Sequence, residues 1–258
     1  MISNIDFKKY SSSWGIDEYT VMREYIQLVF LGALYQTKNS EKVFFKGGTA
    51  LRLIYNSMRF SEDLDFDSKL TYSDIKTLFE KSIKDIQNFL PGISLIIIEN
   101  KYDNFKAKIR YEDNSLPYPL NIRIDVNTKE EWLEKNTSLL VSSIPIPYSS
   151  IIKVFSASEI LVEKIRALIG RSKGRDLFDI WFLLGRGVEI DNRLLKKKMS
   201  LYAKDINLEE IRKVVLDFND KKLKDDLNKF LPLKQRVIIP YLKESLIKLL
   251  DETKSIQT

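Results

Sequence analysis

The chain has 258 residues and a net charge of +6, with 44% hydrophobic and 30% charged residues. That length suits one large domain or two modest ones with a sizeable buried core, and the composition is typical of a soluble globular protein. No apolar run reaches the roughly 18 residues of a membrane span, and the N-terminus lacks the basic and apolar regions of a signal peptide. We therefore expect a cytoplasmic location and no membrane partner.

The absence of both Cys and His restricts the chemistry that the chain can perform. Without Cys there is no disulfide, thiolate metal site or cysteine nucleophile. Without His, neither a Ser-His-Asp triad nor a His-ligated zinc is possible. Any bound metal must have oxygen ligands, which favours Mg²⁺, Mn²⁺ or Ca²⁺. Any general base must be a carboxylate, a lysine or a tyrosine.

Positive charge is unevenly distributed along the chain. Residues 1–150 contain 19 Lys and Arg against 20 Asp and Glu, whereas residues 151–258 contain 23 against 16. A basic half joined to a near-neutral half indicates a polyanionic partner, although an ordinary solvated surface explains the same excess about equally well.

The first predicted elements alternate between helix and strand. Apolar periodicity predicts a helix over residues 17–36 with Asp17 as a candidate cap. Residues 42–46 form a short apolar run typical of a buried strand, which ends at a glycine turn, and Thr49 can cap a helix that continues to about residue 55. Acidic and apolar residues alternate over 62–67 with strand periodicity. Residues 73–90 have the pattern of an amphipathic helix capped by Ser73.

The later elements divide the chain into two parts. Three strand-like segments follow at 93–99, 104–112 and 119–127, and a proline-rich stretch at 144–148 is typical of a linker. Beyond it the pattern predicts only helices, at 157–170, 174–185, about 191–201, 207–217, 219–230 and 234–250. This order predicts an α+β fold, with a mixed sheet in a domain over residues 1–150 and an all-helical domain over 151–258.

Gly47, Gly48 and Thr49 form a turn between a predicted strand and a predicted helix. Glycines let the backbone approach a ligand closely, and the free N–H groups at a helix N-terminus bind phosphate. A turn that merely joins the strand to the helix explains these residues about as well.

Asp63 and Asp65 stand two residues apart on a predicted strand, so their carboxylates project to the same face. Like charges this close repel each other, and a divalent cation resolves the repulsion. A solvated strand edge is the alternative explanation. It accounts for the acids but not for their position 15–17 residues after Gly48, a separation that could bring them back beside the glycine turn.

Asp125 is the candidate third carboxylate, because it alternates with the buried-type residues Ile124 and Val126 on a predicted strand. Two-metal phosphoryl transfer commonly uses three carboxylates, one of which bridges the metals or accepts a proton from the attacking hydroxyl. An aspartate on an exposed face explains the same pattern almost equally well.

Lys164 lies at the rim of an apolar helix stripe, from which it can extend to solvent or reach a triphosphate. Asp176 and Asp179 stand three residues apart and share one face of the next predicted helix. A structural ion pair between the two helices explains these three residues at about even odds.

Two groups of motifs occur in a fixed order. The first is Phe45-Lys46-Gly47-Gly48-Thr49-Ala50-Leu51-Arg52 with Arg59-Phe60-Ser61-Glu62-Asp63-Leu64-Asp65-Phe66, and the second is Glu163-Lys164-Ile165-Arg166-Ala167-Leu168 with Arg175-Asp176-Leu177-Phe178-Asp179-Ile180. Together they resemble the AbiEii/AbiGii toxin family of nucleotidyltransferases. The resemblance covers roughly residues 40–185, and the paired motifs are specific.

The resemblance implies a polymerase-β-like nucleotidyltransferase core, followed by a helical domain that completes the cleft and binds the acceptor. It implies that Asp63 and Asp65 bind the metal, with Lys164 and Asp176 or Asp179 completing the active site. Asp125 as a third metal ligand rests on the strand pattern alone. The expected cofactor is Mg²⁺ or Mn²⁺ and the expected substrate is an NTP. The residues expected to bind the nucleotide are Lys46, Gly47, Gly48, Thr49, Arg52, Ser61 and Lys164.

Members of this family serve as toxins of bacterial toxin–antitoxin and abortive-infection systems, and some are thought to transfer nucleotides to tRNA. We therefore expect transfer of NMP from an NTP to an RNA acceptor, tRNA in particular, and an antitoxin as partner. One alternative is a non-catalytic NTP- or RNA-binding relative, against which the intact Asp63 and Asp65 argue. The other is a nucleotidyltransferase that acts on a small molecule or a protein, against which the basic excess in residues 151–258 argues weakly.

Overall fold

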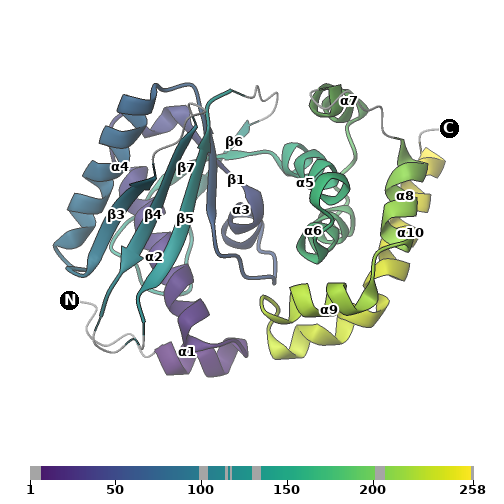
Figure 1. Cartoon of the computed structure of the whole chain (residues 1–258), viewed down its shortest axis with the longest axis horizontal. Coiled ribbons are helices and arrows are strands. Elements are labelled where there is room, and N and C mark those ends of the chain that lie inside the picture. The colour runs from purple at the N-terminus through teal and green to yellow at the C-terminus, as the bar shows by residue number, and fades with distance from the viewer. Residues whose placement is uncertain are drawn as a thin grey trace. The chain divides into compact units, whose positions relative to one another are not determined.

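The structure is a computed structural model that describes residues 7–98, 104–113, 116, 118–129, 135–200 and 207–256. The chain forms two compact units, with the boundary between Phe155 and Ser156. The first unit combines a sheet with helices, and the second is helical (Figure 1). None of the described helices is long and apolar enough to cross a membrane.

A seven-stranded sheet in the order β3-β4-β5-β2-β1-β7-β6 forms the first unit. Its strands are β1 (Val43–Lys46), β2 (Leu64–Ser68), β3 (Ile93–Ile98), β4 (Phe105–Tyr111), β5 (Leu120–Asn127), β6 (Lys135–Leu139) and β7 (Ile151–Phe155). β1 pairs with β7 and β2 with β5 in parallel, while the other neighbouring strands run antiparallel. The sheet is therefore mixed, and the predicted α+β fold is confirmed.

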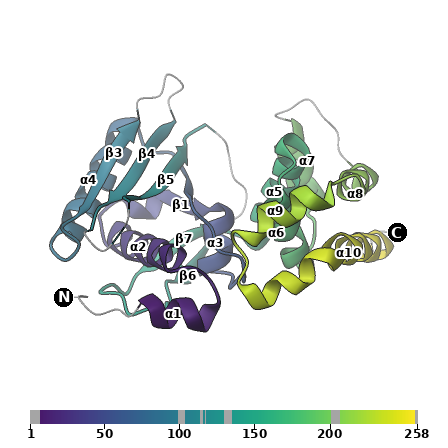
Figure 2. The same cartoon turned by 60° about the horizontal axis from the view of Figure 1, so that its bottom comes forward.

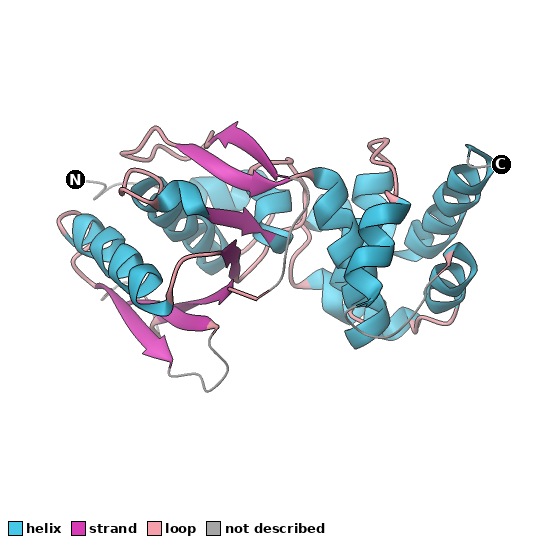
Figure 3. Cartoon of the chain, turned by 90° about the horizontal axis from the view of Figure 1, so that it is seen from above, coloured by secondary structure: helices cyan, strands magenta, loops and turns pink. Residues whose placement is uncertain are grey.

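Helices cover one face of this sheet (Figures 2 and 3). The helical elements of the unit are α1 (Phe7–Trp14), α2 (Glu18–Leu34), η1 (Ser40–Lys42), α3 (Gly47–Leu53) and α4 (Tyr72–Gln87). Phe79 of α4 joins the layers, because its ring centroid lies 5.3–5.7 Å from those of Phe30, Phe66 and Phe105. Burying each such aromatic side chain stabilises the fold by roughly 1.5–3 kcal/mol. The core thus lies between the sheet and the α2–α4 layer.

Strand alternation leaves β4 and β5 polar on the other face of the sheet. In β5, Leu120, Ile122, Ile124 and Val126 are buried, whereas Asn121 and Arg123 between them are exposed. Successive side chains of a strand point to opposite faces, so the register of the sheet decides which polar residues become neighbours. The open face is consequently where the acidic residues of β2 and β5 gather.

The second unit contains α5 (Ala157–Arg171), α6 (Gly174–Leu184), α7 (Asn192–Ser200), α8 (Leu208–Leu216), α9 (Asp220–Asn228), η2 (Leu233–Tyr241) and α10 (Leu242–Ile256). Side-chain caps start several of these helices, since Ser156 accepts a hydrogen bond from the Glu159 backbone and Asn207 forms a capping box with Glu210. The indole of Trp181 donates to Ser245, which ties α6 to α10. The helices predicted after residue 156 are present, except that the one predicted over 234–250 is divided.

Several local predictions are wrong. Lys46, not Thr49, is the N-cap of α3, and the helix begins at Gly47 itself. Thr71, not Ser73, caps α4 by accepting from the Asp74 backbone. The helix predicted over 234–250 is divided into η2 and α10, because Pro240 has no N–H to donate within a regular α-helix.

Three further elements, α1, β6 and β7, were not predicted from the sequence. β6 is a polar edge strand without apolar alternation, and β7 is a short apolar run that follows directly on the proline-rich stretch. Residues 99 and 201, at the ends of two predicted elements, lie outside the described residues.

Tyr35, which follows α2, provides a test of how the sheet is held together. Its hydroxyl lies 2.8 Å from the Val43 carbonyl of β1 and 2.9 Å from the Lys153 carbonyl of β7. Burial raises the pKa of Tyr35 well above its usual value, so the group stays a neutral donor. We predict that Tyr35→Phe lowers the free energy of unfolding by about 1–2 kcal/mol, because it removes the donor and leaves the carbonyls less satisfied.

Urea denaturation followed by circular dichroism measures this change. Tyr10→Phe is the matched control, since its hydroxyl makes only an exposed 3.3 Å bond to the Ser143 carbonyl. An equal loss of stability in both variants would contradict the role given to Tyr35.

Candidate active site

The glycine turn begins α3 directly after β1. Gly47 has a φ of +78°, a left-handed conformation that favours glycine. A Cβ atom at Gly47 would overlap the Oδ2 atom of Asp65, and one at Gly48 would lie 2.6 Å from Nη2 of Arg59 and 2.9 Å from Oγ of Ser61. Both glycines are thus required for the close approach of the Arg59, Ser61 and Asp65 side chains to the start of the helix.

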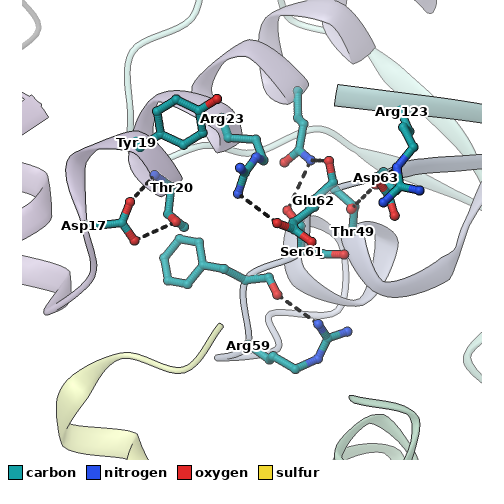
Figure 4. Close-up of polar contacts among 12 residues, drawn as sticks. Asp17, Tyr19, Thr20, Arg23, Thr49, Arg59, Ser61, Glu62, Asp63 and Arg123 are labelled. Atoms are coloured by element: carbon teal, nitrogen blue, oxygen red, sulfur yellow. Dashed lines mark hydrogen bonds and ion pairs between the residues drawn. The ribbon is translucent and has the colours of Figure 1, made fainter. Parts of the chain in front are cut away.

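Hydrogen bonds to main-chain carbonyls fix the segment that enters β2. The hydroxyl of Thr49 donates to the carbonyl of Asp63 over 2.5 Å (Figure 4). The amide Nε2 of Gln27, on α2, donates to the carbonyls of Ser61 at 3.2 Å and Glu62 at 3.1 Å. Because α2 and α3 both hold this segment by its backbone, its side chains remain available for other contacts.

Ionic contacts reinforce the same segment. Figure 4 shows Arg23 of α2 directed toward Glu62, with Nη1 and Oε1 separated by 3.7 Å. Arg52 of α3 forms a two-point ion pair with Glu24 of α2, at 2.7 and 3.2 Å, and its guanidinium lies 3.9 Å from the centroid of the Phe60 ring. The structure therefore places Arg52, expected from the sequence to bind the nucleotide, in contacts that join α3 to α2.

Register places the three candidate carboxylates on one face. Asp65 is the Cα partner of Asp125 in the parallel β2–β5 pair and of Lys46 in the antiparallel β1–β2 pair. Asp63 lies two residues before Asp65 and so projects to the same side. β2 is flanked by β5 and β1, so the alternative of a solvated sheet edge does not hold for these acids.

A basic side chain accompanies each of three acids on this face. Nε of Arg123 lies 3.3 Å from Asp63 (Figure 4), and Nζ of Lys106 lies 3.3 Å from Asp125. These two ion pairs are substantially exposed and individually weak. Deeper in the sheet, Nζ of Lys46 lies 2.8 Å from Asp67, whose side chain is fully buried. Lys46, another expected nucleotide ligand, is therefore held by Asp67.

No group of three or more acidic side chains in the described parts of the chain is arranged to hold a metal ion. The donor types nevertheless suit a hard divalent cation, because carboxylate oxygens are its preferred ligands. Asp63 and Asp125 face Arg123 and Lys106 instead of each other, so a shared cation has to displace these two exposed side chains. The chemistry of the residues fits a metal, and their present conformation is that of an ion-paired surface.

Lys164, Asp176 and Asp179 meet inside the second unit. Nζ of Lys164 on α5 lies 2.8 Å from Asp179 and 3.6 Å from Asp176, both on α6. Arg171 also binds Asp176 through two hydrogen bonds of 2.8 Å. Both carboxylates are fully buried. The ion pair that the sequence offered as an alternative explanation is thus present, and a catalytic role for the three residues stays a prediction.

Gln27 and Arg59 are two positioning residues that the sequence-based site omitted. Gln27 is 1% exposed within an apolar helix, and a polar residue in such a place needs hydrogen-bond partners. Arg59 is 2% exposed, and its Nη1 donates to the Phe60 carbonyl over 2.9 Å (Figure 4). The signal for Gln27 was an amide side chain within the apolar helix predicted over residues 17–36, whereas Arg59 belongs to the motif that carries the family resemblance.

Gly47 and Gly187 form a matched pair for testing the turn. Both have positive φ, +78° and +75°, but a Cβ at Gly187 would meet nothing within 4 Å. We predict that Gly187→Ala costs only the backbone strain, about 1 kcal/mol. Gly47→Ala should lower the free energy of unfolding clearly more, because the new methyl group also displaces the Asp65 carboxylate. It should also abolish the expected transfer of NMP.

Chemical denaturation measures the free energy of unfolding that each variant loses relative to the wild type. Equal destabilisation, together with full activity of Gly47→Ala, would show that the contact with Asp65 does not matter.

A mixed sheet, a glycine turn that opens a helix, and carboxylates grouped on neighbouring strands are together the features of a nucleotidyltransferase. The chain belongs to the family described as nucleotidyl transferase AbiEii toxin of a type IV toxin–antitoxin system, which matches residues 29–236. Membership makes an NTP the substrate and implies an antitoxin as partner. No curated protein matches the chain.

Solved structures share the fold. The MenT4 nucleotidyltransferase toxin of Mycobacterium tuberculosis is 16% identical with a TM-score of 0.64, and the match covers 96% of this chain and 89% of that one. JHP933 from Helicobacter pylori is 21% identical with a TM-score of 0.62, covering 94% and 95%. A putative nucleotidyltransferase from H. pylori is 19% identical with a TM-score of 0.58, covering 93% and 99%. At these identities the likeness shows the fold alone.

Proposed function

We propose that this toxin transfers NMP from an NTP to RNA, tRNA in particular, in a reaction that requires a divalent metal and the carboxylates of Asp63 and Asp65. The observation that carries the proposal is the contact between Gly47 and Asp65. It sets the N-terminus of α3, where free N–H groups favour phosphate, directly against an acid that favours a cation. A nucleoside triphosphate with its metal needs both at once. Such a reaction takes place in the cytoplasm, where tRNA and NTPs are found.

Asp63, Asp65 and Asp125 are the residues that would hold Mg²⁺ or Mn²⁺. A cation bound there would neutralise negative charge on the phosphates during transfer. Asp125, the Cα partner of Asp65, would also be suited to accept the proton of the attacking hydroxyl. With no His in the chain, a carboxylate is the natural base for this step.

The remaining residues of the first unit divide into binding and positioning roles. Gly47 and Gly48 offer backbone N–H groups to the phosphates, and Ser61, beside Gly48, offers a hydroxyl. Thr49 and Arg52 complete the set expected to bind the nucleotide, while Thr49 also holds the Asp63 carbonyl and Arg52 pairs with Glu24 of α2. Lys46, the Cα partner of Asp65, also belongs to the proposed nucleotide ligands, and its pair with Asp67 fixes the position of its side chain.

Lys164 is proposed to bind the triphosphate, with Asp176 and Asp179 fixing its position. The family resemblance assigns it this role, and its 2.8 Å contact with Asp179 supports the positioning part of the proposal. A lysine held beside two buried carboxylates loses little further side-chain freedom on binding an anion.

The transfer reaction can be tested with labelled NTPs and total tRNA. We predict label in tRNA with Mg²⁺ and none with EDTA. Asp65→Asn should lower the rate by about 100-fold or more, the scale of losing one electrostatic group at a phosphoryl site. Asp85→Asn on the exposed surface of α4 is the matched control and should be fully active.

Three outcomes would contradict parts of this proposal. Full activity of Asp65→Asn would remove the carboxylate from the mechanism. Label on protein or on a small molecule in place of tRNA would replace the acceptor. NTP binding without any transfer would favour a non-catalytic relative.

Lys164→Arg tests the role of the second unit. Arginine keeps a positive charge beside Asp176 and Asp179, whereas Lys164→Met would remove the cation that lies 2.8 Å from the buried Asp179 and cost about 3–5 kcal/mol. We predict that Lys164→Arg raises the KM for NTP by roughly 10-fold with a nearly unchanged urea midpoint, because the guanidinium presents its donors in a different geometry. An unchanged KM in the folded variant would leave Lys164 a purely structural residue.

A further inference from the structure

Four cations lie together on the open face of the sheet, away from α2 and α4. Lys106, Lys108 and Arg110 occupy alternate positions of β4, and the residues between them, Phe105, Ala107 and Ile109, are buried on the opposite face. Arg123 of β5 is the Cα partner of Lys108. We call these four residues the basic face. Figure 1 shows β3, β4 and β5 side by side, with α2 and α4 behind them.

The basic face presents a regular row of accessible charge. Same-face residues on a strand are about 6.6 Å apart, because each residue rises about 3.3 Å. The side chains of Lys106, Arg110 and Arg123 are 44%, 42% and 74% exposed. The near-neutral balance of residues 1–150, with 19 basic against 20 acidic side chains, conceals this clustering.

Two members of the row lead directly to the candidate catalytic acids. Arg123 contacts Asp63 and Lys106 contacts Asp125, each at 3.3 Å. Arg110 pairs with the exposed Glu112, an interaction of little strength. Lys108 has no ion-pair partner among the residues that the structure describes. The basic face is therefore continuous with the site and keeps cations that an incoming anion can engage.

Apolar surface borders the row on its outer side. Ile96 and Ile98 of β3 are 40% and 41% exposed and are the Cα partners of Lys108 and Lys106. A single strand of nucleic acid combines regularly spaced phosphates with apolar sugar and base surfaces. An acidic protein could also bind the positive row, but its binding would gain nothing from a row that leads to Asp63 and Asp125.

We propose that the basic face binds the phosphate backbone of the acceptor RNA and guides its reacting hydroxyl toward Asp125. This inference rests on the proposed function, and it assigns acceptor binding to the sheet instead of to the basic helical part of the chain. Each phosphate contact contributes through counterion release, so it should be visible in the salt dependence of binding.

Lys108→Gln tests the assignment by fluorescence anisotropy with a labelled single-stranded RNA and, separately, with tRNA. EDTA and the absence of NTP prevent turnover, so the measurement is independent of catalysis. Loss of one phosphate contact should weaken binding about 5- to 8-fold at 0.05–0.1 M salt and reduce the slope of log K against log salt by about 0.7. The matched control is Lys81→Gln, which removes the same charge from the exposed surface of α4 and should bind as the wild type does.

An equal effect of both variants, or no effect of Lys108→Gln, would overturn the proposal. Lys108→Gln that binds RNA normally but escapes its antitoxin would assign the basic face to a protein partner and would also overturn it. If transfer to tRNA fails while Lys108→Gln still weakens RNA binding, the proposed reaction falls and the basic face stands. If transfer to tRNA occurs and Lys108→Gln binds RNA as the control does, only the present inference falls.

Discussion

The close contact between Gly47 and the Asp65 carboxylate is the constraint on which the site depends. It requires a glycine at positive φ directly after Lys46, the residue that pairs with Asp65 across the β1–β2 ladder. The surrounding bonds all serve to keep that contact. Gln27 and Thr49 hold the carbonyls of residues 61–63, so the acids enter β2 with a fixed direction. The groups proposed to bind phosphate and the cation thereby become neighbours, although they come from different elements of the chain.

Charge balance is the second organising feature of the first unit. The buried Asp67 is paired with Lys46, whereas the more exposed acids face Arg123 and Lys106. Exposed pairs of this kind contribute little to stability and exchange partners easily. In the proposed reaction, Asp63 and Asp125 can therefore exchange these side chains for a divalent cation at a small cost in free energy. Arg123 and Lys106 are then available to bind phosphate. The buried Asp67 keeps its partner Lys46, while the exposed ion pairs of Asp63 and Asp125 remain available for binding.

Local periodicity was enough to predict most of the fold but not its pairings. The alternation of residues 62–67 predicted β2, and the apolar stripe of residues 73–90 predicted α4. The register that makes Asp125 the partner of Asp65 depends on contacts between distant strands, which no local pattern contains. Arg52 illustrates the same limit, because the motif gives no sign of its ion pair with Glu24, 28 residues earlier. Thr49 failed as a cap because a glycine already starts the helix, and its hydroxyl is used for Asp63.

Asp63 and Asp65 are proposed to hold a divalent cation beside the glycine turn. Crystals grown with Mn²⁺ and a non-hydrolysable NTP would test this proposal most directly, through the anomalous scattering of manganese. We predict a peak about 2.1 Å from carboxylate oxygens of Asp63 and Asp65, phosphate oxygens at the N–H groups of Gly47 and Gly48, and Arg123 withdrawn from Asp63. Manganese absent from these carboxylates while the nucleotide is bound, with Arg123 still paired to Asp63, would contradict it.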